Sequence, residues 1–187
     1  MAPNVEDVAE YLLDQDVIWV DGGSVVNLLA LWRAHGLDEV MRTAWERGIV
    51  LAGVSAGSMC WHIGGATDSF GPELRPCTDG LGLLPYGNGV HYGVNPLRRE
   101  LIGQMVGDGR FERAYSSENG IGLVYNGTEL VEVVSDREEV YGWHTYRDGD
   151  DVVEDRLTPP AARLTPHTTS PERSRPERHT VVTSPVR

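Results

Sequence analysis

The sequence predicts an α/β protein, a three-layer αβα sandwich with a mainly parallel sheet and an antiparallel hairpin near its C-terminal end. Two observations lead to this prediction. Short apolar runs alternate with segments of helical periodicity through the first 54 residues, which is typical of parallel strands connected by helices. Further along, two strand-like segments flank Asn126-Gly127, a dipeptide typical of a tight turn between antiparallel strands.

The N-terminal part contains two apolar runs, Val17–Val20 and Ile49–Val54, that are continuous rather than alternating. Continuous apolar runs of this length are typical of strands buried on both faces of a sheet. Before and between them, apolar side chains recur with helical spacing, and Gly36 separates the last two helical segments. The expected helices are Val5–Leu13, Val25–His35 and Leu37–Arg47.

The later part of the chain has strand character. Ile121–Tyr125 and Thr128–Ser135 flank the expected turn, and Val140–Tyr146 is expected to form a further antiparallel strand. From Thr158 onward the chain carries six of its 11 prolines and few large apolar side chains. Such a segment buries too little apolar surface to offset the entropy lost on ordering. We therefore expect one α/β domain over residues 1–157 and a disordered tail over residues 158–187.

Charge and composition exclude several classes of function. Residues 1–157 hold 11 arginines against 26 acidic residues, a net charge of −15, and such a surface would repel the phosphates of a nucleic acid. No apolar run approaches the length of a membrane span, and the first residues lack the pattern of a signal peptide. With Cys60 and Cys77 as the two cysteines, a disulfide framework is not expected, and the cytoplasm is the expected location.

The motif Gly53-Val54-Ser55-Ala56-Gly57 carries the clearest chemical signal. It has the form G-x-S-x-G and stands between an expected strand and an expected helix. A tight strand-to-helix turn leaves no room for side chains at the two glycines, and it exposes the serine hydroxyl at the edge of the sheet. A plain turn with an N-capping serine would have the same pattern. The strand context favours a nucleophile at Ser55.

A serine nucleophile needs a base, and four histidines precede the tail: His35, His62, His91 and His144. His35 stands at the expected end of a helix. His62 lies about two turns beyond Ser55 on the helix expected there, too far to reach back. His91 lies in a short apolar segment between glycines, suited to a loop at the sheet edge, and is the preferred base. His144, on a late strand, is the second candidate.

The base needs an orienting acid, and three carboxylates lie between Ser55 and His91: Asp68, Glu73 and Asp79. Spacing alone does not choose among them, although Asp68 follows the expected length of the helix after the nucleophile.

An oxyanion hole needs two backbone donors. The N–H of Ala56 is one natural donor, and a glycine loop after a neighbouring strand should supply the other. Gly22 and Gly23 directly follow the strand expected at Val17–Val20. A plain strand–helix connection would also explain these two glycines.

Together these segments resemble peptidase family S51, the group of peptidase E (aspartyl dipeptidase) and cyanophycinase. The resemblance extends from about Val5 to Tyr146, and its most specific parts are Asp21–Leu29, Gly53–Trp61 and the run Leu81–Pro85 that leads to His91. It implies a class I glutamine-amidotransferase-like fold. It also implies a serine exopeptidase that hydrolyses small peptides, with Asp-X dipeptides as the expected substrates, through an acyl-enzyme.

By that resemblance Ser55 is the nucleophile, His91 is the base and Asp68 is the preferred acid, with Glu73 still open. The base takes the proton of the hydroxyl as the oxygen attacks the peptide carbonyl, and water then releases the acyl-enzyme. No cofactor and no metal are implied. The expected partner is a small peptide, without nucleic acid or membrane, and a homodimer stays open.

The same resemblance implies further binding residues. Gly22 or Gly23, together with Ala56, would form the oxyanion hole. Arg98 and Arg99 would hold the carboxylate of an N-terminal aspartate, because a guanidinium suits a bidentate contact with a carboxylate.

Alternatives remain. Family members have an additional β-α-β stretch before the helix that opens this chain, so a truncated or catalytically inactive S51-like protein is one of them. An α/β-hydrolase esterase is another, although only 36 residues separate Ser55 from His91 where that fold inserts several βα units. A glutamine amidotransferase would need cysteine in place of Ser55, and Cys60 comes five residues too late.

Overall fold

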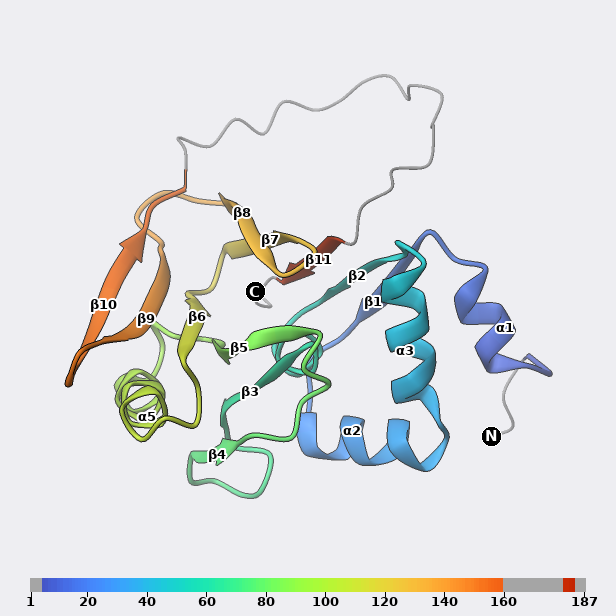
Figure 1. The fold of residues 1–187 in the computed structure, drawn as a ribbon, viewed down its shortest axis with the longest axis horizontal. Coiled ribbons are helices and arrows are strands. Elements are labelled where there is room, and N and C mark those ends of the chain that lie inside the picture. The colour runs from blue at the N-terminus through green and yellow to red at the C-terminus, as the bar shows by residue number, and fades with distance from the viewer. Residues whose placement is uncertain (1–4, 160–179, 184–187) are drawn as a thin grey trace.

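The computed structural model describes residues 5–159 and 180–183. Their strands form two sheets with helices packed around them, which confirms the predicted α/β class (Figure 1). A five-stranded sheet has the order β1-β2-β11-β7-β8, and a six-stranded sheet has the order β10-β9-β6-β5-β3-β4. Both sheets contribute side chains to one large apolar core.

The five-stranded sheet contains the first two strands of the chain. Its parallel strands are β1 (Val17–Val20), β2 (Val50–Gly53) and β11 (Thr180–Thr183). The antiparallel pair β7 (Ile121–Asn126) and β8 (Glu129–Ser135) completes it. This pair confirms the predicted hairpin, and Gly127 at its turn has φ of 58°, a conformation that glycine adopts without strain.

Strand β11 lies inside this sheet, paired with β2 on one side and with β7 on the other. The sequence predicts disorder from Thr158 onward, and for Thr180–Thr183 that prediction is wrong. The short β-branched sequence there suits a strand, but the composition of the whole tail hides it. Residues 160–179 and 184–187, to which the same prediction applies, lie outside the described residues.

The six-stranded sheet carries a parallel core of β3, β5 and β6, to which the other strands add antiparallel pairs. Its strands are β3 (His62–Thr67), β4 (Arg75–Cys77), β5 (Leu84–Gly89), β6 (Arg113–Ser117), β9 (Gly142–Asp148) and β10 (Asp151–Leu157).

The prediction of a mainly parallel sheet is wrong. Among the described strands, four pairs are parallel and five are antiparallel. The N-terminal helix–strand alternation predicts one of the parallel pairs, β1 with β2, and the others are β2 with β11, β3 with β5 and β5 with β6. Three antiparallel pairs, β3 with β4, β7 with β8 and β9 with β10, join consecutive strands through short connections, which only antiparallel strands permit. The other two, β6 with β9 and β7 with β11, pair strands that are distant along the chain.

The described helices are α1 (Val8–Leu13), α2 (Val25–Ala34), α3 (Leu37–Glu46), α4 (Ala56–Met59) and α5 (Pro96–Gly107). Figure 1 shows α1, α2 and α3 together beside β1 and β2, while α5 packs against the other sheet. Ser24 begins α2 by accepting a hydrogen bond from the N–H of Asn27 at 3.3 Å, and His35 ends it as predicted. No helix in the described ranges is long and apolar enough to cross a membrane.

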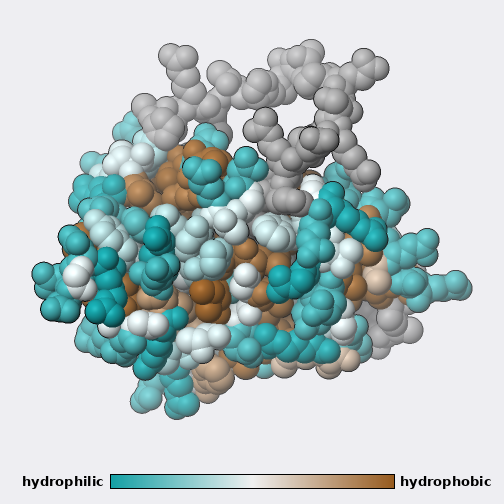
Figure 2. Space-filling model, in the orientation of Figure 1, coloured by the Kyte–Doolittle hydropathy of each residue, from teal (hydrophilic) through white to brown (hydrophobic). Residues whose placement is uncertain are grey.

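The apolar side chains fall into two clusters. The larger joins α2, α3, β1, β2 and β7, and the smaller lies between α5 and the six-stranded sheet. In the view of Figure 2, hydrophilic residues occupy most of the outline and apolar ones gather toward the centre. On the edge strand β1, Val17 and Trp19 remain about half exposed, at 50% and 54%.

Candidate active site

The candidate active site lies where parallel strands of both sheets end. Ser55 follows β2, His91 comes two residues after the end of β5, and Gly23 lies in the loop after β1. Asn119 follows β6, the parallel neighbour of β5. Because the carboxyl ends of parallel strands open onto the same edge, residues far apart in the sequence meet there.

Ser55 occupies a strained turn between β2 and α4. Its φ of 55° and ψ of −113° lie in a region that residues other than glycine rarely adopt. A side chain at Gly53 would collide with the carbonyl oxygen of Gly57, and one at Gly57 would collide with that of Val20. The two glycines of the motif therefore permit the close approach of β1, β2 and α4, as the sequence predicts.

His91 contacts the nucleophile directly. Its Nε2 lies 3.0 Å from Oγ of Ser55, and its Nδ1 lies 2.8 Å from Oδ1 of Asn119. An amide oxygen can only accept a hydrogen bond, so Nδ1 carries the proton and donates it to Asn119. Nε2 is then left unprotonated toward Ser55, the arrangement in which a histidine can accept a hydroxyl proton.

The structure does not place any predicted acid against His91. Asp68 instead pairs with Arg98, with Oδ2 3.2 Å from Nη2 of the guanidinium. Glu73 lies beside α5 in a separate groove, and Asp79 pairs with Arg33 at 2.7 Å. The prediction failed because these residues follow β3 and its turns, whereas the strand that ends next to His91 is β6.

Asn119 is the candidate site residue that the sequence analysis missed. It stands in the turn Glu118-Asn119-Gly120 after β6, downstream of His91 rather than between His91 and Ser55. A search restricted to carboxylates in that interval could not find it. A strand followed by a polar turn was the available signal, but only the pairing of β6 with β5 brings the turn to the histidine.

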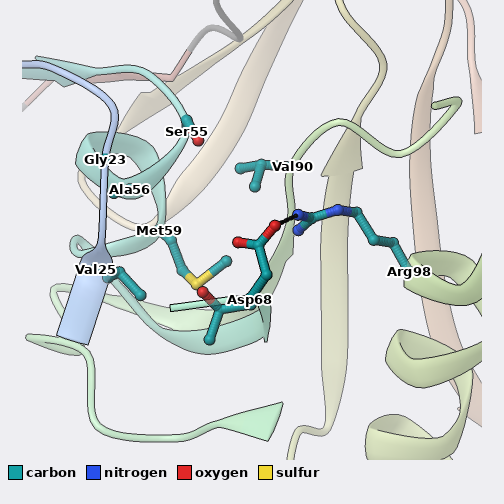
Figure 3. Close-up of a pocket in the computed structure, with 9 residues that line it drawn as sticks. Gly23, Val25, Ser55, Ala56, Met59, Asp68, Val90 and Arg98 are labelled. Atoms are coloured by element: carbon teal, nitrogen blue, oxygen red, sulfur yellow. Dashed lines mark hydrogen bonds and ion pairs between the residues drawn. The ribbon is translucent and has the colours of Figure 1, made fainter. Parts of the chain in front are cut away.

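The predicted oxyanion donors are partly assembled. Gly23 and Ala56 line the same small pocket as Ser55, whereas Gly22 is not among its lining residues (Figure 3). Ala56 is the first residue of α4, where backbone N–H groups lack acceptors within the helix. Residues of two loops, Gly23 and Ala56, therefore lie beside Ser55, where an oxyanion formed from a substrate's carbonyl oxygen would need donors.

The two candidate arginines point in different directions. Arg98 lines the pocket, is 8% exposed, and donates from Nη1 to the carbonyl oxygen of Ala66 at 2.9 Å. Figure 3 shows its guanidinium reaching Asp68 across the pocket from Gly23. Arg99 instead stacks on the ring of Trp143, with 4.0 Å from its Cζ to the ring centroid. Arg99 is not among the residues that line the pocket, because successive helical residues face different sides of α5.

The other histidines in the described part of the chain do not contact Ser55. His62 begins β3, because α4 is a single turn rather than the longer helix expected. His144 lies on β9, stacked between Tyr115 and Tyr146 with ring centroids 4.7 Å away on each side. Burial, and then the nearby cation of Arg113, lower the pKa of His144.

Cys60, five residues after Ser55, is also unsuited to nucleophilic chemistry. Cys60 is fully buried, and its Sγ contacts the carbonyl oxygen of Gly57 at 3.3 Å. Burial raises the pKa of this thiol well above its usual value, so it stays protonated. Within the described residues, no group of three or more His, Cys, Asp or Glu side chains is arranged to hold a metal ion.

His62 should make stability depend on pH. Burial, partly offset by the contact of Nδ1 with the carbonyl oxygen of Ser58, lowers its pKa to about 4 from 6.5. Between these two values the unfolded chain binds a proton that the folded chain does not, so stability falls as the pH falls. At pH 5 this group should reduce the free energy of unfolding by about 2 kcal/mol relative to pH 7.

Urea unfolding at pH 7 and pH 5 measures this effect. His62→Gln should show a smaller loss of stability between the two pH values than the wild type. His35→Gln, the same substitution at an exposed helix end, should retain the wild-type loss. Equal pH dependence in the wild type and His62→Gln would contradict the prediction.

Comparisons with known proteins identify the family of the chain. The model of peptidase family S51 matches residues 1–133. The chain is 36% identical over 135 residues to the uncharacterized peptidase YgaJ of Bacillus subtilis (strain 168), covering 72% of this chain and 58% of that protein. The chain thus spans little more than half the length of this relative. No solved structure matches it. The match to the family model over most of the chain, with the strained serine turn inside it, shows that the protein belongs to peptidase family S51.

Proposed function

We propose that the protein is a serine exopeptidase that hydrolyses small peptides with an N-terminal aspartate, through an acyl-enzyme on Ser55. The observation that carries this proposal is the 3.0 Å contact between Oγ of Ser55 and Nε2 of His91 at a strained turn. Family membership supports a peptidase, and the contact supports a serine as its nucleophile.

The reaction follows from the two hydrogen bonds of His91. As Oγ of Ser55 attacks the peptide carbonyl carbon, its proton moves to Nε2 of His91. The imidazolium formed is held in place through Nδ1 by Asn119, whose amide oxygen offers a dipole instead of a full negative charge. His91 then gives the proton to the departing amine, whose bond to the carbonyl carbon breaks.

The tetrahedral intermediate carries a negative oxygen that needs donors. The N–H groups of Ala56 and Gly23, which line the pocket with Ser55, are the proposed pair. In the second half, His91 takes a proton from water, the water oxygen attacks the acyl carbon, and Ser55 leaves with that proton. The products are the free amino acid and the remaining peptide or amino acid.

The substrate preference is proposed from the charges that line the pocket. An N-terminal aspartate carries an ammonium group and a carboxylate close to its scissile carbonyl. Asp68 and Arg98 offer the opposite pair, and Arg98 engages Asp68 and Ala66 with two of the five N–H groups of a guanidinium. A buried arginine with donors to spare is suited to bind the carboxylate, and Asp68, with its side chain 61% exposed, to bind the ammonium.

The test is hydrolysis of Asp-Leu and Ala-Leu by the wild type and Arg98→Met. The variant should lose about 10- to 100-fold in kcat/KM for Asp-Leu, because it removes a charge-assisted hydrogen bond to the aspartate carboxylate. The loss for Ala-Leu should be much smaller. Arg33→Met, which removes an arginine paired with Asp79 outside the pocket, is the matched control and should leave the ratio of the two substrates unchanged.

Two outcomes would count against the proposal. A parallel loss for both substrates in Arg98→Met would mean that Arg98 maintains the pocket rather than selecting aspartate. A folded wild type without hydrolysis of any dipeptide would favour the catalytically inactive alternative. The esterase alternative receives no support from the family match.

A further inference from the structure

We propose that the hairpin of β9 and β10, which lies beyond the residues matched by the family model, positions the catalytic residues. It does so through two carboxylates, Glu154 on the His91 side and Glu118 on the Asn119 side. This inference rests on the proposed function, because it concerns the geometry of the same site. The match to the family model ends at residue 133, and the hairpin begins at Gly142.

On the histidine side the link runs through Tyr92. This residue directly follows His91, is 3% exposed, and donates its hydroxyl to Oε1 of Glu154 on β10 at 2.6 Å. Thr145 of β9 donates to the same oxygen at 3.2 Å, and Arg99 forms an ion pair with the other oxygen. Burial first, and then Glu154, raise the pKa of Tyr92, so its hydroxyl remains a donor.

The backbone of the His91 loop needs such an anchor. His91 has φ of 54°, a conformation that costs a residue with a side chain free energy and persists only where its surroundings fix it. The N–H of Tyr92 donates to the carbonyl oxygen of Ser117 at 3.1 Å, which attaches the loop to β6. The hydroxyl of Tyr92 adds a second attachment, to β10, at the other end of the same residue.

On the asparagine side the link runs through Glu118, the neighbour of Asn119. Its Oε1 accepts from the indole N–H of Trp143 at 2.9 Å, and its Oε2 accepts from the backbone N–H of Tyr141 at 3.2 Å. The side chain also passes under the histidine loop, since a Cβ at Gly93 would lie 3.2 Å from Cγ of Glu118. The histidine loop is therefore attached to β10, and the asparagine loop to β9 and to the residue before it.

The two attachments converge on one surface of the hairpin. The guanidinium of Arg99 stacks on the ring of Trp143 and pairs with Glu154, and the indole N–H of Trp143 donates to Glu118. Arg99 and Trp143 therefore connect the Glu118 contacts with the Glu154 contacts. The exposed side of the hairpin offers a matched comparison. There the hydroxyl of Tyr146 donates to Oδ2 of Asp155 at 3.1 Å, also between β9 and β10, without contact to either loop of the site.

The experiment compares Tyr92→Phe with Tyr146→Phe in the full chain. Each removes one hydroxyl that bonds to a carboxylate of β10. Tyr92→Phe should lower kcat for Asp-Leu by roughly tenfold with KM changed less than about twofold, because a misplaced base slows the chemical step without removing substrate contacts. Tyr146→Phe should keep the wild-type kcat.

A double-mutant cycle with Asn119→Ala separates positioning from general destabilisation. If Tyr92 acts through the orientation of His91, adding Tyr92→Phe to Asn119→Ala should lower kcat by less than it does in the wild type. The inference would be overturned if Tyr92→Phe lowered kcat by the same factor in the Asn119→Ala variant as in the wild type. It would also be overturned if Tyr92→Phe alone kept the wild-type kcat. Thermal unfolding of each variant reports whether the fraction folded is equal at the assay temperature.

The experiments distinguish a failure of the proposed function from a failure of the inference about positioning. If the wild type hydrolyses no dipeptide, the function fails, and NMR of the Nδ1 proton of His91 tests the positioning directly. That proton, assigned by its absence in His91→Gln, should exchange with water faster in Tyr92→Phe than in Tyr146→Phe. Equal exchange rates in the two variants would overturn the inference even without turnover.

Discussion

Replacing Ser55 with alanine should lower kcat/KM for Asp-Leu by about 10⁴-fold or more, the cost of removing the nucleophile from a triad of this kind. The fold should be retained, because the hydroxyl contacts His91 at the pocket and alanine removes only that group. The measurement is steady-state hydrolysis by both proteins, purified side by side, with circular dichroism to show equal folding.

Ser58→Ala is the matched control for this prediction. Ser58 lies three residues further along, on α4, and its hydroxyl donates to Oδ1 of buried Asn88 at 3.1 Å. Its removal should reduce the free energy of unfolding by about 1–2 kcal/mol and leave hydrolysis within a few-fold of the wild type. Equal loss of hydrolysis in both variants, or full activity in Ser55→Ala, would contradict the assignment of the nucleophile.

Gly57→Ala should destroy the turn that presents Ser55. An alanine Cβ there would collide with the backbone carbonyl of Val20 and would lie 2.8 Å from the Cβ of that residue. A carbonyl in a paired strand cannot move aside as a flexible side chain can. The variant should therefore lose about 3 kcal/mol or more of stability, the upper end of overpacking costs, and lose hydrolysis as well.

Gly103→Ala provides the control with the same chemical change. Gly103 lies within α5, and nothing stands within 4 Å of an added Cβ. Alanine has the higher helix propensity, so this variant should gain about 0.5–1 kcal/mol of stability. Urea unfolding of both variants measures the difference. A Gly57→Ala protein as stable as the wild type would show that the turn relaxes and that the glycine is not required for close packing.

Local patterns predicted the elements whose signals are short-range. The run Val17–Val20 is a strand with the predicted bounds, α2 is capped by His35 before Gly36, and the hairpin turns at Asn126-Gly127. The helix after Ser55 was expected to be longer. It stops after one turn because His62 enters β3, and that pairing with β5 is not encoded by local periodicity.

The candidate site also contains residues that local sequence predicts and residues that it does not. Ser55 and the two glycines around it are recognisable from sequence, because the steric demand of the turn acts on adjacent residues. The choice of His91 among the four histidines rested on its place between glycines and on the resemblance, and the structure brings it to Ser55. The acid was predicted among Asp68, Glu73 and Asp79, and none of them contacts His91.

What the sequence by itself determined is therefore the α/β class, the serine turn and the family, since each depends on residues that are neighbours in the chain. Only the tertiary structure decided that Asn119 meets His91, that Arg98 rather than Arg99 faces the pocket, and that Thr180–Thr183 joins the sheet. The first and the last depend on which strands lie side by side, and the second on how α5 packs against the sheet. Strand order is set by long-range burial and pairing, for which a residue pattern of a few positions carries no information.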